Sequence, residues 1–231
     1  MPGFLSHRQP ELVEWMDKAD CDLKQLHQTY RHFRTVNRFL SGWKRVYKTR
    51  IRPKLERDKT NTFLDIGFGG ADIPIALEQW SKKDGFKINI LAIELDDRAL
   101  DFAKTLDVSD SITFEKKHTR TLIEEGRTFD FVLSNHVLHH LQDEEIPVLL
   151  DEAKQLTKKA VIFNDIERSV LGYGLFASIT PLLFRNSFVS KDGLISIKRS
   201  FKAEELEQLV PKTWNIDQMP LFRILLTLDK T

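Results

Sequence analysis

An acid and two glycines follow a short apolar run in the segment FLDIGFGGADIP, residues 63–74. Gly67 and Gly69 predict a turn at which a ligand can approach the backbone closely. Asp65, just before them, suits a ligand with a positively charged amine. Asp72 stands where a dinucleotide-binding fingerprint has its third glycine, and its charge at the start of a helix would repel phosphate. The turn therefore favours a nucleoside ligand with an amine and no phosphate.

A second acid ends the next predicted strand. A carboxylate at Glu94 can accept hydrogen bonds from both hydroxyls of a ribose. S-Adenosylmethionine (SAM) has a ribose, an amine, a cationic sulfonium and no phosphate. Asp65 and Glu94 together therefore favour SAM as the cofactor. A P-loop is excluded because no G-K-[ST] follows the glycines, and Asp72 disfavours a nicotinamide-dependent oxidoreductase.

Histidines follow the predicted fourth strand, in FDFVLSNHVLHHL. The carboxyl end of a strand in a doubly wound sheet faces the ligand crevice, so Asn135 and His136 should line the cofactor or acceptor side. His136, His139 and His140 are the candidate general bases, because imidazole titrates near neutral pH. The alternative for the His139–His140 pair is packing and helix capping. We predict no metal site, because no convincing set of carboxylate ligands accompanies the histidines.

The elements that must position these residues alternate between strand and helix. Strands are predicted at residues 62–66, 86–95, 111–117, 128–135 and 159–166, with helices at 73–80, 97–106, 119–126 and 144–157 between them. A polar connector, a helix at 202–210 and two closing strands around Pro220 complete the chain. This order predicts an α/β fold with a doubly wound, mostly parallel sheet.

Residues 1–58 differ from the rest, because they are helical in pattern and carry no strand signal. The spacing of Leu12, Trp15, Met16 and Ala19 predicts one amphipathic helix, and a second apolar stripe runs over residues 26–40. We expect residues 1–58 to form a helical lid and residues 59–231 the cofactor domain. The basic run at 43–59 is interpreted as a solvated helix face, with RNA or anionic lipid binding as the alternative.

An apolar insertion within residues 168–200 follows the fifth strand. It is either a core segment or an acceptor pocket in which Tyr173, Phe176 and Phe184 stack on an aromatic or prenylated ring. Peripheral membrane contact is a further alternative for this segment. Arg168 is expected to make a structural salt bridge rather than bind substrate.

These motifs resemble those of the class I SAM-dependent methyltransferases. LDIGFGGADIP is similar to the family's first motif, D-x-G-x-G-x-G, LAIELDDRAL to its second-strand motif, and FDFVLSNHVLHHL to its fourth-strand motif. The similarity covers residues 60–231. VLHHL and NDIERS are most similar to the small-molecule methyltransferases of ubiquinone and menaquinone biosynthesis. The resemblance implies a Rossmann-like sheet of seven strands whose last strand is antiparallel.

The resemblance also implies a set of cofactor contacts. They are Asp65, Gly67, Phe68, Gly69, Asp72, Glu94, Leu95, His118, Thr119 and Asn135. Ala71 replaces the family's third glycine, and the turn should tolerate it unless it needs a positive φ. His118 stands where the family often has an acid for the adenine amino group. Either His118 accepts from that group, or Thr119 caps the next helix and its backbone contacts the adenine.

Composition narrows the function classes. The chain has 231 residues and a net charge of +1, which excludes a strong overall electrostatic attraction to nucleic acid. Its single cysteine excludes an intrachain disulfide. No signal peptide or membrane-spanning run is evident, and we expect a cytoplasmic enzyme. The expected reaction is methyl transfer from SAM to a small aromatic or phenolic, polyketide or quinone-like acceptor, at oxygen rather than carbon. The alternatives are a nucleic-acid or protein methyltransferase and a non-catalytic SAM-binding subunit.

Overall fold

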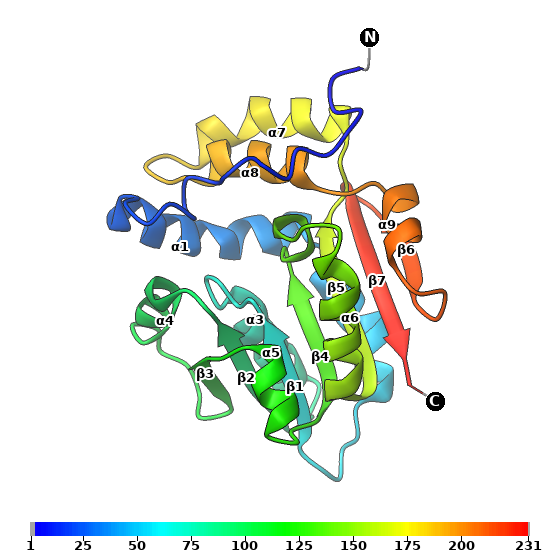
Figure 1. Ribbon diagram of the computed structural model, residues 1–231. Helices are drawn as coiled ribbons and strands as arrows, with labels where there is room; N and C mark the ends of the chain where they lie inside the picture. The colour runs from blue at the N-terminus through cyan, green and yellow to red at the C-terminus, as the bar shows by residue number, and fades with distance from the viewer. Residues whose placement is uncertain (1–2, 231) are drawn as a thin grey trace.

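Seven strands form one sheet at the centre of the molecule (Figure 1). The structure is a computed structural model that describes residues 3–230. The strands are β1 (Asn61–Ile66), β2 (Ile88–Glu94), β3 (Ile112–Lys116), β4 (Phe129–Asn135), β5 (Thr157–Ile166), β6 (Asn215–Met219) and β7 (Arg223–Asp229). Their order is β3-β2-β1-β4-β5-β7-β6, and β7 alone runs in the direction opposite to the other six strands. The predicted doubly wound, seven-stranded fold is confirmed.

Two apolar clusters, one on each face of the sheet, hold the helices. One face packs against α5 (Thr119–Glu124), α6 (Glu145–Leu156) and α9 (Ala203–Leu209). The other packs against α3 (Asp72–Lys83) and a segment made of α2 (Trp43–Val46), η1 (Tyr47–Ile51) and η2 (Arg52–Lys54). The helix α4 (Asp97–Ala103) covers the end near β2 and β3. The inner strands β1, β4, β5 and β7 are buried on both faces over most of their length, as expected for a mostly parallel sheet.

The strand order changes direction between β1 and β4, which lie side by side at the sheet centre. The loop after β1 is the glycine turn, and the loop after β4 leads into the short helix η3 (Leu138–His140). In doubly wound sheets the crevice at this switch point binds ligands. The topology therefore brings the glycine turn and the histidines to one place.

An N-terminal helix and two consecutive helices from the C-terminal half of the chain lie together over the carboxyl edge of the sheet (Figure 1). They are α1 (Leu23–Leu40), α7 (Val170–Leu183) and α8 (Val189–Arg199). The second helical stripe predicted for the N-terminal segment is α1. The polar connector expected before α9 is in fact the helix α8, which buries Val189 and Ile197 and keeps lysines outside. No helix of the described residues is long and apolar enough to cross a membrane.

The amphipathic helix predicted around residues 12–19 is wrong, because this stretch consists of turns. The carboxylate of Asp192 on α8 accepts hydrogen bonds from the backbone N–H groups of Trp15 and Met16, at 2.7 and 3.0 Å. These donors are satisfied by a tertiary partner, so the segment lies against α8 without forming a helix of its own. Packing thus overrode the local helical pattern.

The basic run at 43–59 is a solvated face, as interpreted. Trp43, Tyr47 and Ile51 are buried in the core, whereas most of the intervening lysines and arginines are exposed. This part of the predicted lid therefore lies against the sheet and not over its carboxyl edge.

Candidate cofactor and acceptor site

A cavity of about 1140 Å³ lies at the carboxyl edge of the sheet. The glycine turn, the ends of β2 and β4, and residues of α1, α7 and α8 line it. Every residue predicted to bind the cofactor or act in catalysis lines this cavity: Asp65, Gly67, Phe68, Gly69, Asp72, Glu94, Leu95, His118, Thr119, Asn135, His136, His139 and His140. The fold thus brings them together, and their individual roles stay predictions.

The glycine turn is held in a left-handed conformation. Gly67 has φ 75°, and a Cβ there would lie 2.5 Å from Cγ2 of Val137. Ala71 has φ 59°, so the turn does need a positive φ where the family's third glycine stands. Alanine takes that conformation at a cost of about 1–2 kcal/mol. The departure from the family motif therefore changes the energy of the turn and not its shape.

Three carboxylates surround the turn. Asp65 is buried, and burial, with the charges of Asp72 and Glu94, raises its pKa to about 8. Burial raises the pKa of Asp72 to about 6, although the amide of Asn37 donates to both its oxygens. Within residues 3–230, none of the three acids forms an ion pair with a lysine or arginine. A cationic ligand bound here would favour the ionised form of these carboxyl groups.

The side chain of Glu94 connects β2 to the glycine turn. Its Oε2 accepts a hydrogen bond from the backbone N–H of Gly69 at 3.2 Å, and its Oε1 accepts from that of Leu95 at 2.7 Å. The carboxylate is thereby fixed beside the turn, where the sequence places the ribose of the cofactor.

The start of α5 lies on the same side of the cavity. His118 is the N-cap residue, but its side chain makes no capping hydrogen bond. Thr119 is the first residue of the helix, and its hydroxyl donates to Glu152 on α6. The expectation that Thr119 caps α5 is therefore wrong, because its hydroxyl is used between helices. Contact of either residue with adenine stays a prediction.

His136 is held by an arginine. Nη1 of Arg223 donates to its Nε2 at 2.6 Å, and burial together with the charge of Arg223 keeps the pKa of His136 well below its ordinary value. The same guanidinium donates to Oδ1 of Asn135 and of Asn164. A neutral His136 with this nitrogen engaged is poorly placed to remove a proton through it. Sequence reasoning missed Arg223, although a lone arginine at the start of an apolar strand was a signal.

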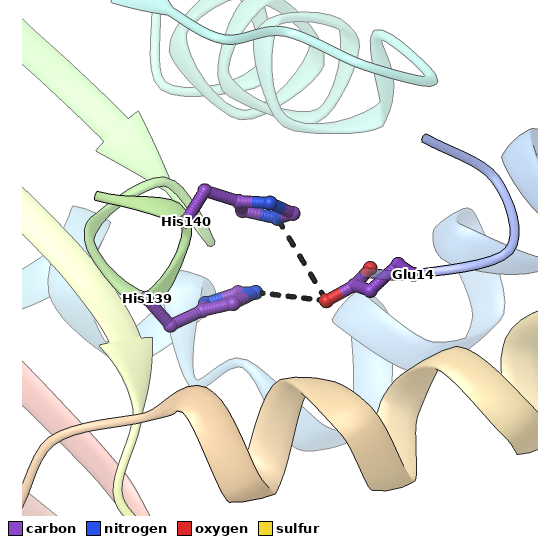
Figure 2. A group of neighbouring side chains, drawn as sticks. All are labelled: Glu14, His139 and His140. Carbon is purple, nitrogen blue, oxygen red and sulfur yellow. Dashed lines mark ion pairs between the residues drawn. The ribbon is translucent and has the colours of Figure 1, made fainter. Parts of the chain in front are cut away.

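His139 lies between two carboxylates. Its Nδ1 donates to Oδ1 of Asp165 at 2.7 Å, and its Nε2 lies 3.4 Å from Oε1 of Glu14 (Figure 2). Burial alone would lower the pKa of His139, but Asp165 and Glu14 outweigh it and raise this pKa to about 9. His139 is therefore held in place on both ring nitrogens, as a buried cation.

His140 contacts the same carboxylate and is one-third exposed. Its Nε2 lies 3.9 Å from Oε1 of Glu14, and its Nδ1 lies 3.4 Å from Oδ2 of Asp17 (Figure 2). The expectation that no carboxylates accompany the histidines is wrong. Glu14 and Asp17 come from the N-terminal segment. They are so distant from the histidines in sequence that no local pattern could have linked them. Asp165 could have been found from the sequence, because it is an acid at the carboxyl end of a predicted buried strand. Glu94 was selected for the same reason.

The insertion forms the outer wall of the cavity. Phe176 and Phe184 line it, whereas Tyr173 packs edge-on against Phe4, with ring centroids 5.0 Å apart. Arg168 is buried and pairs with Glu205, so the structural salt bridge expected for it is confirmed. Apolar residues that line the cavity and yet are exposed include Phe39, Val148, Leu175, Ile179, Leu183 and Leu221.

Residues 63–160 match the family model described as a methyltransferase domain. A comparison with curated protein sequences gives no match. Among solved structures the chain is similar to the plantazolicin methyltransferase BpumL in complex with SAH, with 13% identity, coverage of 94% of this chain and 93% of that one, and a TM-score of 0.57.

Two further structures share the fold. Magnesium protoporphyrin IX methyltransferase (ChlM) from Synechocystis PCC 6803, with bound SAH, has 14% identity, a TM-score of 0.51 and coverage of 88% of this chain and 86% of that one. The pyocyanin biosynthetic protein PhzM has 14% identity, a TM-score of 0.58 and coverage of 90% of this chain and 60% of that one. Residues 63–160 thus match a methyltransferase domain, and the seven-stranded fold of the chain is that of these methyltransferase structures.

Proposed function

We propose that this enzyme transfers a methyl group from SAM to a small, largely apolar acceptor that carries a hydroxyl. The observation that carries the proposal is the charge distribution of one cavity. Asp65, Asp72 and Glu94 place three carboxyl groups around the glycine turn, none of which is paired with a lysine or arginine of residues 3–230, while α7 contributes apolar side chains to the same cavity. A cation-bearing nucleoside at the acids and an apolar molecule at the wall would fill both parts.

The cofactor is assigned to the glycine-turn end. Asp65 would face the amine of SAM, and Glu94 would accept from its ribose hydroxyls. The backbone around Gly69 leaves open space for the ligand, since a Cβ there would meet nothing within 4 Å. Leu95, His118 and Thr119 lie where the adenine would extend. Binding of SAH by structural neighbours supports this arrangement.

The acceptor is assigned to the wall formed by α7. Exposed apolar side chains are unfavourable in water, and Leu175, Ile179 and Leu183 all line the cavity. An aromatic, polyketide or quinone-like acceptor would cover them. Two neighbours are named as methyltransferases of plantazolicin and of magnesium protoporphyrin IX, which also supports a small-molecule acceptor.

The reaction is a displacement at the methyl carbon. The acceptor hydroxyl loses its proton to solvent, its oxygen forms a bond to that carbon, the carbon–sulfur bond breaks, and the electron pair of that bond stays on the sulfur of SAH. Alignment in a closed site can supply about 7–11 kcal/mol of the barrier. His139 is buried and Arg223 occupies Nε2 of His136, whereas the side chain of His140 is one-third exposed, so we place the acceptor hydroxyl beside Glu14 and His140.

The lid is assigned to part of the N-terminal segment. Residues 11–17 and α1 cover the cavity together with α7 and α8, and Tyr30 and Phe33 of α1 line it. Trp15 points elsewhere, with Lys18 and Lys191 over its ring. Excluding water in this way strengthens electrostatic interactions with the sulfonium.

Calorimetric titration with S-adenosylhomocysteine, with NADH as the control ligand, tests the cofactor site. We expect micromolar binding of S-adenosylhomocysteine, at least tenfold weaker binding by Asp65→Asn, and no change in Asp110→Asn, an exposed acid away from the cavity. Transfer of labelled methyl from SAM to hydroxylated aromatic acceptors then tests catalysis. Equal binding by Asp65→Asn would remove the cofactor proposal, and binding without any transfer would favour a non-catalytic SAM-binding subunit.

A further inference from the structure

Three metal-ligating atoms converge in the lining of the cavity. They are Nε2 of His139, Nε2 of His140 and Oε1 of Glu14, with both ring nitrogens directed at the same carboxylate oxygen (Figure 2). The two histidines sit on η3, and Glu14 comes from the N-terminal segment. The fold alone brings them together.

We propose that Glu14, His139 and His140 form a binding site for one divalent cation of the zinc type. Bonds of about 2.0–2.1 Å in tetrahedral geometry separate neighbouring ligand atoms by about 3.3–3.5 Å. The nitrogens of His139 and His140 lie 3.4 and 3.9 Å from Oε1 of Glu14. A cation placed between them would need only a small inward movement of the more exposed His140. Two imidazoles and one carboxylate suit Zn²⁺ better than Mg²⁺ or Ca²⁺, which prefer oxygen ligands.

The surroundings of the two imidazoles match those of metal-bound histidines. Such a histidine nearly always donates its other ring N–H to a carboxylate, carbonyl or water, which fixes its tautomer and orientation. Nδ1 of His139 donates to Asp165 at 2.7 Å, and Nδ1 of His140 lies 3.4 Å from Asp17. Both rings are therefore oriented with Nε2 toward Glu14 by an outer carboxylate.

An independent observation also indicates a ligand. Nε2 of His139 is fully buried, and its contact with Oε1 of Glu14 at 3.4 Å is an ion pair without hydrogen-bond geometry; it makes no hydrogen bond with any residue from 3 to 230. His139 itself is only 1% exposed. Buried polar nitrogens in folded proteins nearly always have a partner, and this one is directed into the space between Glu14 and His140. A metal cation there would replace the proton on Nε2 and bond directly to both the imidazole and Glu14.

The position of the site gives the cation a role in the proposed reaction. All three ligands line the cavity, so a fourth coordination position would face the acceptor. An acceptor oxygen bound there would lose its proton to solvent more readily, because a cation stabilises the oxyanion. This role rests on the proposed function, whereas the binding of metal does not.

Metal titration of the chelator-treated full chain, without a histidine tag, tests the site. We expect one equivalent of Zn²⁺ to bind by calorimetry, and Co²⁺ to give the intense visible absorption typical of four-coordinate sites. His140→Ala and Glu14→Gln should each weaken binding at least a hundredfold. Asp17→Asn should weaken it about 10–100-fold, as outer carboxylates do. His7→Ala, which removes an exposed histidine outside the cluster, should bind as the unaltered chain does.

Thermal unfolding of each metal-free variant separates loss of a ligand from loss of the fold. Zn²⁺ should also raise the melting temperature of the unaltered chain, because it would join the N-terminal segment to η3. Absence of saturable binding, or equal binding by His140→Ala, would overturn the proposal. Titration with S-adenosylhomocysteine on the same samples keeps the two proposals distinct. If S-adenosylhomocysteine does not bind, the cofactor proposal is wrong; if Zn²⁺ does not bind, only the metal site is wrong.

Discussion

The amide of Asn37 donates hydrogen bonds to both carboxylate oxygens of Asp72, at 3.1 and 3.3 Å. Asn37 lies near the end of α1, and Asp72 is the first residue of α3, directly after the glycine turn. This contact joins the N-terminal helix to the turn that is proposed to hold the cofactor. Order in α1 and order in the turn are therefore expected to depend on each other.

Replacement of Asn37 by alanine should destabilise the protein. The partly buried carboxylate of Asp72 would lose two hydrogen bonds, and a bond to a charged group contributes about 1.5–3 kcal/mol. Urea unfolding should show a loss in that range, together with weaker binding of S-adenosylhomocysteine. Asn215→Ala, at an exposed position of β6, should change stability by less than about 0.5 kcal/mol. Equal stability of the two variants would contradict the structural role of the contact.

Gly70→Ala should disturb the packing of α1 on the glycine turn. A Cβ at Gly70 would lie 2.9 Å from the backbone oxygen of Tyr30, which cannot move without the helix. We expect a loss of about 1–3 kcal/mol of stability by thermal unfolding. Gly174→Ala is the matched control, because a Cβ there has open space and lies within α7. It should stabilise by about 0.5–1 kcal/mol, and a similar loss in both variants would refute the explanation.

The stability of the ligand-free protein should fall as the pH rises from about 5 to about 8. In the folded state the pKa of Asp65 is raised to about 8, above the value of about 3.9 in an unfolded chain. The folded state therefore holds this proton more tightly, and the stability that it provides is full below pH 4 and lost as pH rises through 8. Asp72, with a pKa of about 6, adds to the same trend.

Comparison with Asp65→Asn isolates this effect, since an amide does not ionise. Denaturant unfolding across the pH range should show the unaltered protein losing stability relative to the variant between pH 5 and 8. Parallel curves would show that Asp65 is ionised in the ligand-free fold. Binding of S-adenosylhomocysteine at pH 7 should release protons, because its amine favours the charged carboxylate, and calorimetry in buffers of different ionisation enthalpy measures that release.

Ile179→Glu should weaken binding of apolar molecules in the cavity. Ile179 lines the cavity from α7 and is half-exposed, so glutamate there would fold normally and place a charge against the acceptor. We expect at least tenfold weaker binding of the apolar fluorophore Nile red. Leu182→Glu changes the same helix at an exposed residue outside the cavity lining, and it should bind the dye as the unaltered chain does. Equal loss in both would place the dye on the outer face of α7.

The α/β order and the cofactor end of the site were readable from the sequence, because their signals are local. Apolar runs, turn residues and the acids after β1 and β2 lie within a few residues of one another, so strand, turn and helix could be placed without tertiary information. Asp65 and Glu94 were assigned from such spacing, and both line the cavity. The N-terminal residues 12–19 show the limit, because there backbone donors found Asp192 and no helix formed.

The acceptor end was decided by tertiary structure alone. Glu14 reaches His139 and His140 across more than 120 residues of chain, and Arg223 reaches His136 across 87. No local pattern encodes such distances, and the charge states of these groups depend on burial and on partners that only folding supplies. The sequence by itself determined a SAM-type methyltransferase fold and its cofactor turn. Only the tertiary structure showed that Arg223 contacts His136 and that Glu14 lies beside His139 and His140.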